Sequence, residues 1–170
     1  MEKQLVSLYQ NLQKLAGLHR QLLDVVRLER QFIIQAHLNE IHNVTNMKQA
    51  LVESVYQVES ERLKLTSELA IYWKKPFYDL TLSNIIIHIQ GVDPKGADQF
   101  RSTYNLLTIL IQRITEQNQD NRLLIEKSLE HVHEMKKNIL GEACQKSSTY
   151  THQGQRTTNQ AVSRIISQEA

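Results

Sequence analysis

Proline, glycine, cysteine and aromatic residues are all scarce in this chain of 170 residues. Five glycines and two prolines leave few places for tight turns, so the secondary-structure elements must be long. Aromatic residues make up only 6% of the chain while Gln, Glu, Leu and Lys are abundant, which is typical of an all-α bundle. A single cysteine, Cys144, excludes a disulfide within the chain, and a reducing compartment is the simpler interpretation.

The chain also lacks an excess of one charge and a long apolar run. Its 20 basic and 18 acidic side chains give a net charge of +2 at pH 7, which favours neither a nucleic-acid surface nor electrostatic docking on a membrane. No stretch approaches the roughly twenty apolar residues of a membrane span. The N-terminus reads MEKQLVSLYQ, without the apolar block of a signal peptide. We therefore predict a soluble, cytoplasmic protein that does not insert into a membrane.

The longest uninterrupted pattern runs from Phe100 to Leu140 and predicts one long α-helix. Apolar residues recur there at steps that mostly alternate between four and three, the spacing of a seam that packs against partner helices. The seam consists of Phe100, Tyr104, Leu107, Ile111, Ile114, Asn118, Asn121, Ile125, Val132, Met135 and Ile139. A helix of about forty residues is about 60 Å long and is stable only if its stripe is covered, so the rest of the chain must cover it.

Two seams of the same period lie upstream and predict an antiparallel helical hairpin. The first consists of Leu5, Leu8, Leu12, Leu15, His19, Leu22, Val26, Glu29 and Ile33. The second consists of Ile41, Val44, Lys48, Leu51, Val55, Val58, Arg62, Leu65, Leu69 and Tyr72. The pattern loses phase between them, which places the turn near His37 and Leu38. Facing residues of such a hairpin have numbers that add to about 77.

This register places Glu29 opposite Lys48 and Leu5 opposite Tyr72. We predict that Glu29 and Lys48 are in contact and that their role is to select the register, because burying two charges costs desolvation and adds little net stability. His19, in the first seam, is interpreted as a histidine at the edge of the core that forms a local hydrogen bond.

Asn118 and Asn121 fill two positions of the long seam where aliphatic residues are expected. An asparagine in a seam fixes the register at a cost in stability, because its amide must find a partner inside. The alternative is that the two amides recognise a partner at the surface. We favour the register role.

A short helix joins the hairpin to the long helix. Pro76 ends the second helix, and the apolar residues Phe77, Tyr78 and Leu80 are expected to cap that end of the bundle. Thr81 is a suitable N-cap for the short helix, whose apolar face consists of Leu82, Ile85, Ile86 and Ile89. Gly91 ends it, and Asp93 precedes Pro94 at the start of the long helix.

The composition changes after Leu140. Residues 147–160 are polar except for Tyr150, so nothing there offsets the entropy lost on ordering. Ala161, Val162, Ile165 and Ile166 then recur at the spacing of a short amphipathic helix. We therefore predict a helical bundle over residues 1–144 and a mobile tail over residues 145–170. The apolar stripe of the tail either docks on a partner or packs back on its own bundle, and both readings stay open.

Motifs for catalysis are missing from the sequence. It contains no CxxC pair, no glycine-rich phosphate loop and no Gly-x-Ser-x-Gly elbow. A di-iron site in a helical bundle needs two Glu-x-x-His pairs, and only Glu130-x-x-His133 occurs. Cys144 has no evident basic partner and is interpreted as an ordinary thiol. We expect no enzymatic activity, metal, cofactor or small-molecule substrate.

Several segments together resemble the FlgN-type flagellar export chaperones. Residues 118–132 read NQDNRLLIEKSLEHV, which is similar to the Asn-x-x-Asn-x-x-Leu helix of that family. Residues 149–155 read TYTHQGQ, which is similar to its Thr-Tyr-Gly-x-x-Gly-Gln signature. Glu29 and Lys48 stand where the hairpin of the family has its Glu-Arg and Lys positions, and residues 80–82 match the start of its short helix.

Two positions depart from the pattern of the family. His37 replaces the usual Asp at the hairpin turn, and Thr151 replaces the Gly after the signature tyrosine. The second departure affects the local turn of the tail.

The resemblance implies a protein that binds other proteins and has no catalytic act. Members of this family bind the C-terminal helical segments of the hook-filament junction proteins FlgK and FlgL in the cytoplasm. They keep these segments unpolymerised and deliver them to the export gate protein FlhA. Carried over by position, Tyr150 docks on the gate. The residues that hold the cargo are Ala161, Val162, Ile165 and Ile166.

A structural coiled coil that acts by self-association is the alternative from another functional class. It accounts for the long seams and for the two asparagines. It gives no reason for a polar segment with one tyrosine or for the terminal apolar stripe.

Overall fold

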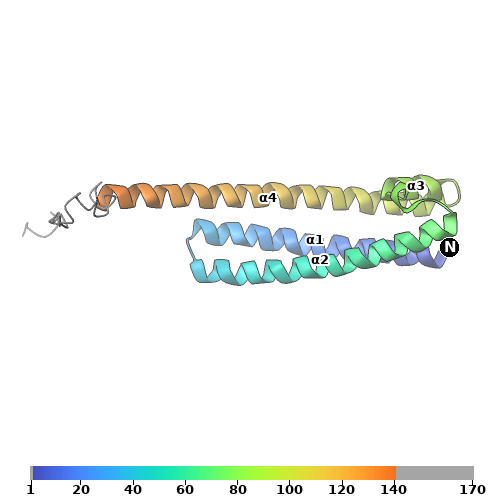
Figure 1. Ribbon diagram of the computed structural model, residues 1–170, viewed down its shortest axis with the longest axis horizontal. Coiled ribbons are helices and arrows are strands. Elements are labelled where there is room, and N and C mark those ends of the chain that lie inside the picture. The colour runs from blue at the N-terminus through green and yellow to red at the C-terminus, as the bar shows by residue number, and fades with distance from the viewer. Residues whose placement is uncertain (1, 141–170) are drawn as a thin grey trace, which may run out of the picture. The chain divides into compact units, whose positions relative to one another are not determined.

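The computed structural model describes residues 2–140, and every regular element in that range is a helix (Figure 1). The elements are α1 (Glu2–Ile34), α2 (Leu38–Trp73), the 3-10 helix η1 (Phe77–Asp79), α3 (Leu82–Gln90) and α4 (Pro94–Leu140). This confirms the predicted all-α fold with a long antiparallel hairpin, a short helix and a long fourth helix. The predicted tail with its amphipathic helix lies outside the described residues.

The chain divides into two units, Met1–Leu124 and Ile125–Ala170, so the division falls within α4. The first unit contains α1, α2, η1, α3 and most of α4. Of the second unit, the structure describes only the last turns of α4. The predicted domain boundary after Cys144 lies beyond the described range and remains a prediction.

The hairpin turn spans the three residues between Ile34 and Leu38, slightly before the predicted position. Ala36 adopts a left-handed conformation with φ of 54°, and the His37 N–H then donates to the Phe32 carbonyl at 3.0 Å. His37 is the N-cap of α2, but its side chain makes no capping hydrogen bond. With histidine at position 37, this helix therefore starts without a side-chain cap.

Helix α2 ends as Pro76 predicts. Lys74 is left-handed with φ of 52°, its N–H donates to the Ile71 carbonyl at 3.3 Å, and the Lys75 N–H donates to the Ala70 carbonyl at 3.0 Å. These are the two hydrogen bonds of a Schellman motif, which satisfies carbonyl groups at a helix end.

Helix α3 starts at its predicted cap. Thr81 Oγ1 accepts a hydrogen bond from the Asn84 N–H at 3.3 Å, as expected of an N-cap. Ile85, Ile86 and Ile89 are buried, so this isoleucine-rich segment packs as a helix, as predicted.

The hydrophobic core of the first unit is arranged along α1. Figure 1 shows α1 and α2 side by side, with α3 near the N-terminal end of α1. One cluster joins α1, α2, α3 and the start of α4 and includes Leu8, Leu12, Val58, Leu69, Ile85 and Phe100. A second cluster joins α1 to α4 and consists of Leu22, Leu23, Val26, Leu110 and Ile114. All of these side chains are buried, and α1 contributes to both clusters.

The predicted seam of α4 is wrong at two positions. Tyr104 and Ile111 are 37% and 49% exposed, whereas their neighbours Thr103 and Leu110 are 8% and 6% exposed. Thr103 is tolerated inside because its hydroxyl donates to the Gln99 carbonyl at 3.0 Å. The apolar stripe of α4 is wide enough for two seams with the same period, and the deeper one contains Thr103 and Leu110.

The predicted seam of α2 is also wrong at its end, because Tyr72 is exposed. The last buried residues of α2 are Leu69 and Ala70. The expected pairing of Tyr72 with Leu5 is therefore not a core contact.

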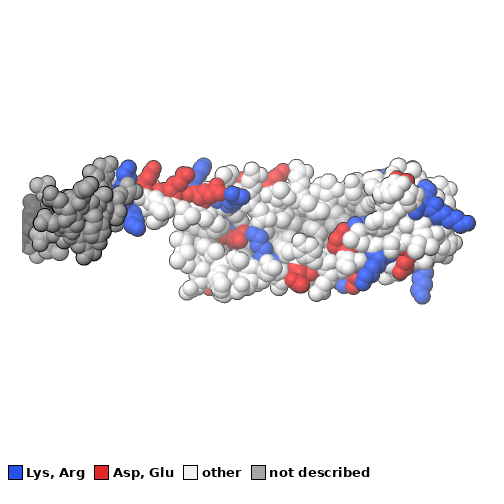
Figure 2. Space-filling model, viewed as in Figure 1, with Lys and Arg blue, Asp and Glu red and all other residues white. Residues whose placement is uncertain are grey.

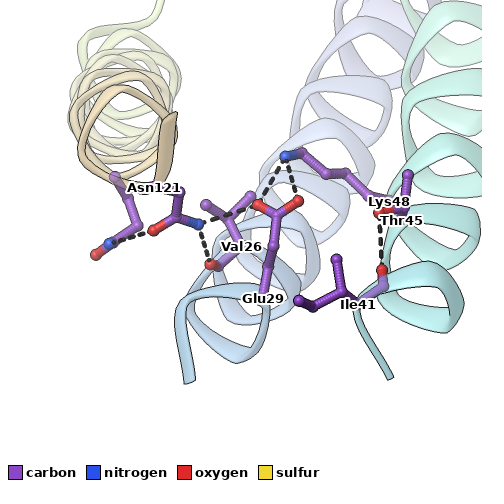
Figure 3. Close-up of polar contacts among 7 residues, drawn as sticks. Val26, Glu29, Ile41, Thr45, Lys48 and Asn121 are labelled. Atoms are coloured by element: carbon purple, nitrogen blue, oxygen red, sulfur yellow. Dashed lines mark hydrogen bonds and ion pairs between the residues drawn. The ribbon is translucent and has the colours of Figure 1, made fainter. Parts of the chain in front are cut away.

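A chain of polar side chains links α2, α1 and α4 (Figure 3). Lys48 Nζ donates to both carboxylate oxygens of Glu29, at 2.9 and 3.2 Å. Asn121 Nδ2 donates to the same carboxylate at 3.0 Å and to the main-chain carbonyl of Val26 at 2.9 Å. Gln117 Nε2 donates to Asn121 Oδ1 at 3.2 Å. We call Lys48, Glu29, Asn121 and Gln117 the polar relay.

The polar relay confirms the predicted contact between Glu29 and Lys48. The side chains of these two residues are only 12% and 26% exposed, and Asn121 is 3% exposed. Both the NH2 group and the carbonyl oxygen of the Asn121 side chain form hydrogen bonds, as expected for a buried amide. Asn118 is half-buried, so the two asparagines are not equivalent. That Glu29, Lys48, Asn118 and Asn121 select the register remains a prediction.

Replacing Lys48 by methionine should destabilise the first unit, because the largely buried Glu29 carboxylate loses its cationic partner. Among the contacts described, Asn121 is then the one side-chain donor left to it. We expect Lys48→Met to lower the free energy of unfolding by about 2–3 kcal/mol. Glu29→Met together with Lys48→Met should lie within about 1 kcal/mol of the parent. Urea unfolding followed by circular dichroism measures both.

Arg27 and Asp24 form the matched control, since their ion pair is 3.7 Å long and both side chains are more than half exposed. Arg27→Met should cost less than about 0.5 kcal/mol. If Lys48→Met costs no more than Arg27→Met, the buried pair has no structural importance.

The missing cap of α2 can be supplied. An aspartate at position 37 can accept a hydrogen bond from the N–H of Asn39 or Glu40, so His37→Asp should stabilise the first unit by about 1 kcal/mol. Thermal unfolding measures the change, and His37→Ala, which adds no acceptor, is the control. Equal melting temperatures for the two variants would show that the turn cannot position a cap.

Candidate functional site

An open groove of about 590 Å³ lies in the first unit between α2 and α4. Leu12 and Leu15 of α1 are buried and form its floor. The α2 wall consists of Val55, Glu59, Arg62, Leu63 and Thr66, and the α4 wall of Tyr104, Leu107, Thr108 and Ile111. Phe77, Tyr78 and Leu80, from η1 and the residue after it, line one end together with Thr81 and Leu82. We call this site the α2–α4 groove.

Apolar side chains at the rim of the α2–α4 groove are exposed to solvent. Tyr78 is 80% exposed, and Leu63, Phe77 and Ile111 are each between 42% and 49% exposed. The linker residues 77 and 78, which were expected to cap the bundle, are therefore largely uncovered, and Leu80 alone is buried. Gathered apolar exposure of this kind marks an interaction site.

The charged side chains and the imidazole that line the groove have partners within their own helices. Arg62 Nε and Nη2 donate to the Glu59 carboxylate at 2.7–3.0 Å. His19 Nδ1 donates to the Leu15 carbonyl at 2.8 Å, which confirms the local hydrogen bond expected for this histidine. With these groups satisfied, the groove favours an apolar ligand over a charged one.

A second apolar surface lies on the part of α4 that belongs to the second unit. The predicted seam residues there are Ile125, Val132, Met135 and Ile139, and Leu129 widens the stripe. These side chains are 41–63% exposed. The described residues therefore do not bury this part of the α4 seam, contrary to the expectation that the rest of the chain covers it. We call Ile125, Leu129, Val132, Met135 and Ile139 the terminal α4 stripe.

The residues predicted to hold cargo and to dock on the gate cannot be placed. Tyr150 and the stripe of Ala161, Val162, Ile165 and Ile166 lie outside the described residues, as does Cys144. Their roles remain predictions.

The described part of the chain contains no cluster of residues suited to binding a metal ion. Glu130 and His133 are both exposed, and residues 2–140 contain no group of three or more His, Cys, Asp or Glu that could hold a metal ion. On the face in Figure 2, acidic side chains gather along the part of α4 that precedes the grey residues, with basic side chains beside them. No described helix is long and apolar enough to span a membrane.

The sequence was compared with protein families, curated proteins and solved structures. The family model described as "FlgN protein" matches residues 1–158. No curated protein and no solved structure matches the sequence. The match includes the residues of the polar relay and extends beyond α4 to Tyr150. Because it covers nearly the whole chain, and because the helical fold agrees with the resemblance, the chain belongs to the FlgN family of flagellar export chaperones.

Proposed function

We propose that this protein binds the C-terminal helical segments of hook-associated proteins of the FlgK and FlgL type. It keeps them unpolymerised in the cytoplasm and delivers them to an export gate of the FlhA type. Membership of the family supports a flagellar export chaperone in general, and the particular cargo, gate and compartment are our proposal. Binding is non-covalent and requires no metal or cofactor.

The terminal α4 stripe is the observation that carries this proposal. Five apolar side chains on one face of a helix are costly to leave in water, and they match the apolar face of a partner helix. When a helical cargo segment packs on this stripe, the apolar face of the cargo segment is buried as well. That reciprocal cover is the physical basis of keeping the segment unpolymerised.

The tail is proposed to complete the cargo surface. Ala161, Val162, Ile165 and Ile166 form the second apolar stripe, and Tyr150 lies in sequence between the two stripes. This order allows a cargo helix to be held on both sides while Tyr150 contacts the gate. When a segment becomes ordered on binding, the loss of conformational entropy lowers its affinity for the cargo. The lower affinity favours release of the cargo at the gate.

Self-association is the second candidate function, and the terminal α4 stripe also supports it. Two such stripes could cover each other in a coiled coil between copies of the chain. The two candidates differ in stoichiometry. A chaperone binds one cargo fragment per chain, whereas a scaffold self-associates without cargo. Sedimentation of the full chain with and without a FlgK C-terminal fragment distinguishes them.

The tail stripe can be tested by adding charge to it. Burial of two isoleucine side chains is worth several kcal/mol, so Ile165→Asp with Ile166→Asp should weaken binding of a FlgK C-terminal fragment by at least about 100-fold. Titration calorimetry measures the binding, and urea unfolding should show an almost unchanged bundle.

The matched control is Gln160→Asp with Ser163→Asp, which adds the same charge to the opposite face of the predicted helix. It should bind cargo nearly as well as the parent. If the isoleucine variant binds cargo normally, the tail stripe does not hold cargo, and if it loses stability as well as binding, the stripe belongs to the core.

The gate-docking role of Tyr150 can be tested separately. Tyr150→Ala should weaken binding to the cytoplasmic domain of an FlhA-type gate by about tenfold or more, because an aromatic anchor is removed, and should leave cargo binding unchanged. Tyr56→Ala is the control, since Tyr56 is an exposed tyrosine of α2 outside the proposed sites. Equal gate binding by both variants would remove Tyr150 from the docking surface.

A further inference from the structure

The α2–α4 groove has the form of a vacant helix position in the first unit. Helices α2 and α4 form its walls and α1 forms its floor. The α2 wall extends from Val55 to Thr66, eleven residues along the helix, or about 17 Å. A helix of about three turns has this length. Because four packed helices are a common arrangement in all-α proteins, a further helix in the groove would complete a bundle with α1, α2 and α4.

Apolar side chains of α4 lie on two adjacent faces of that helix. Thr103 and Leu110 are buried within the first unit, while Tyr104 and Ile111, each one position later, line the groove and are partly exposed. Leu63 on the α2 wall is partly exposed as well. A helix with two adjacent apolar faces normally contacts two neighbours. The described helices cover the first of these faces and leave the second open.

The residues that line the groove have the composition of a protein interface. Aromatic residues make up only 6% of the chain, yet Phe77, Tyr78 and Tyr104 all line this groove together with Arg62. Among the described lining residues, none is a lysine or an aspartate. The buried centres of protein–protein interfaces are enriched in aromatic residues and arginine and depleted of lysine and aspartate. The lining therefore favours a protein partner.

The partner must satisfy the hydrogen bonds of its own main chain. The walls and the floor of the groove are helices, whose main-chain groups are bonded within each helix, and residues 2–140 contain no strand that could offer a free edge. An extended peptide would therefore bury N–H and C=O groups without partners. A helix forms these bonds internally, so the groove fits a helix.

The charges in the groove restrict the partner surface further. Arg62 and Glu59, the charged residues of the lining, form an ion pair with a distance of 2.7 Å between Nη2 and Oε1. A charged side chain of the partner would lose its water without gaining an unpaired ion of opposite sign. The complementary surface is therefore an uncharged helix face about three turns long.

A second copy of this chain does not fill the groove through a symmetric contact. In a two-fold dimer the same patch of each chain meets its counterpart. Two concave grooves that meet in this way leave both floors uncovered, whereas a convex helix fills one groove. The shape of the site therefore favours a helix from a different protein.

We propose that the α2–α4 groove binds an uncharged, apolar helix face of the cargo protein. This inference rests on the proposed function, and it adds a cargo site in the first unit to the one on the terminal α4 stripe. The cargo helix lies between α2 and α4, with its apolar side chains on Leu12 and Leu15. The exposed side chains of Phe77 and Tyr78 bury its end.

Variants of the groove walls test this site in the full chain, with a FlgK C-terminal fragment as the probe in titration calorimetry. Leu63→Glu with Ile111→Glu should weaken binding at least about tenfold, because neither carboxylate finds a partner on an uncharged helix face. Met47→Glu with Ile109→Glu adds the same charges at exposed positions of α2 and α4 outside the groove and should leave the affinity unchanged. Urea unfolding measures the stability of each variant.

A substitution at the rim gives a second test that does not alter the walls. Tyr78 is the most exposed of the aromatic residues that line the groove, so Tyr78→Glu should weaken binding of the fragment several-fold while the free energy of unfolding stays the same. Tyr56→Glu is the matched control, since Tyr56 is also exposed but does not line the groove.

Methyl signals in NMR spectra locate the bound fragment directly. On addition of the fragment, the signals of Leu15, Leu63 and Ile111 in the groove should shift. Those of Ile34 and Val44, near the hairpin turn, should not.

The outcomes separate the groove from the proposed function. If the parent binds the fragment but the groove variants bind it equally well, or the groove methyl signals do not shift, the groove assignment is overturned and the proposed function stands. If the parent does not bind the fragment, the proposed function is wrong and the groove assignment fails with it. Self-association of the parent that is lost in the groove variants would assign the groove to a second copy and overturn the inference.

Discussion

One carboxylate joins three helices of the first unit through hydrogen bonds. Glu29 lies on α1, and it receives hydrogen bonds from Lys48 on α2 and from Asn121 on α4. Apolar seams of uniform period can slide by a heptad with little change in buried area, whereas a largely buried carboxylate that is hydrogen-bonded from two sides cannot slide without losing its partners. We therefore predict that the polar relay selects the register of the three helices, which the leucine-rich contacts alone do not fix. This predicted role would also account for the charged and amide residues that interrupt the apolar seams of α1, α2 and α4.

Much of this arrangement is readable from the sequence, because long helices with few glycines and prolines leave few alternatives. The spacing of the seams predicts the hairpin and the contact between Glu29 and Lys48, and the residue type of Thr81 predicts the cap of α3. It does not distinguish Thr103 from Tyr104 as the inner residue of α4, because the two differ by one position on a wide stripe. Gln117 escapes prediction because glutamine is common on helix surfaces. Its place four residues before Asn121 is the signal that could have identified it.

The apolar residues that the described chain leaves uncovered define the functional problem. A bundle that needs only stability covers its stripes, yet the terminal α4 stripe and the rim of the α2–α4 groove are exposed. Both consist of side chains that a pattern analysis assigns to a core. The periodicity of a sequence shows that one face of a helix must be buried, but it does not show which molecule buries it. In a chaperone, that molecule can be a partner protein. Its surfaces have the pattern of an interior, and under the proposed function they are covered by another chain.

The polar relay also has a consequence for the order of folding. Its bond between Lys48 and Glu29 closes a loop of 19 residues, whereas its bond between Asn121 and Val26 joins residues 95 apart. Because the entropy of closure rises with loop length, we infer that the hairpin forms first and that α4 docks last. Native-state hydrogen exchange would contradict this order if the amides of α4 in the first unit were protected as strongly as those of α1. If the hairpin forms first, a chain still being synthesised contains a complete hairpin before Asn121 is available to the Glu29 carboxylate, and α4 completes the first unit afterwards.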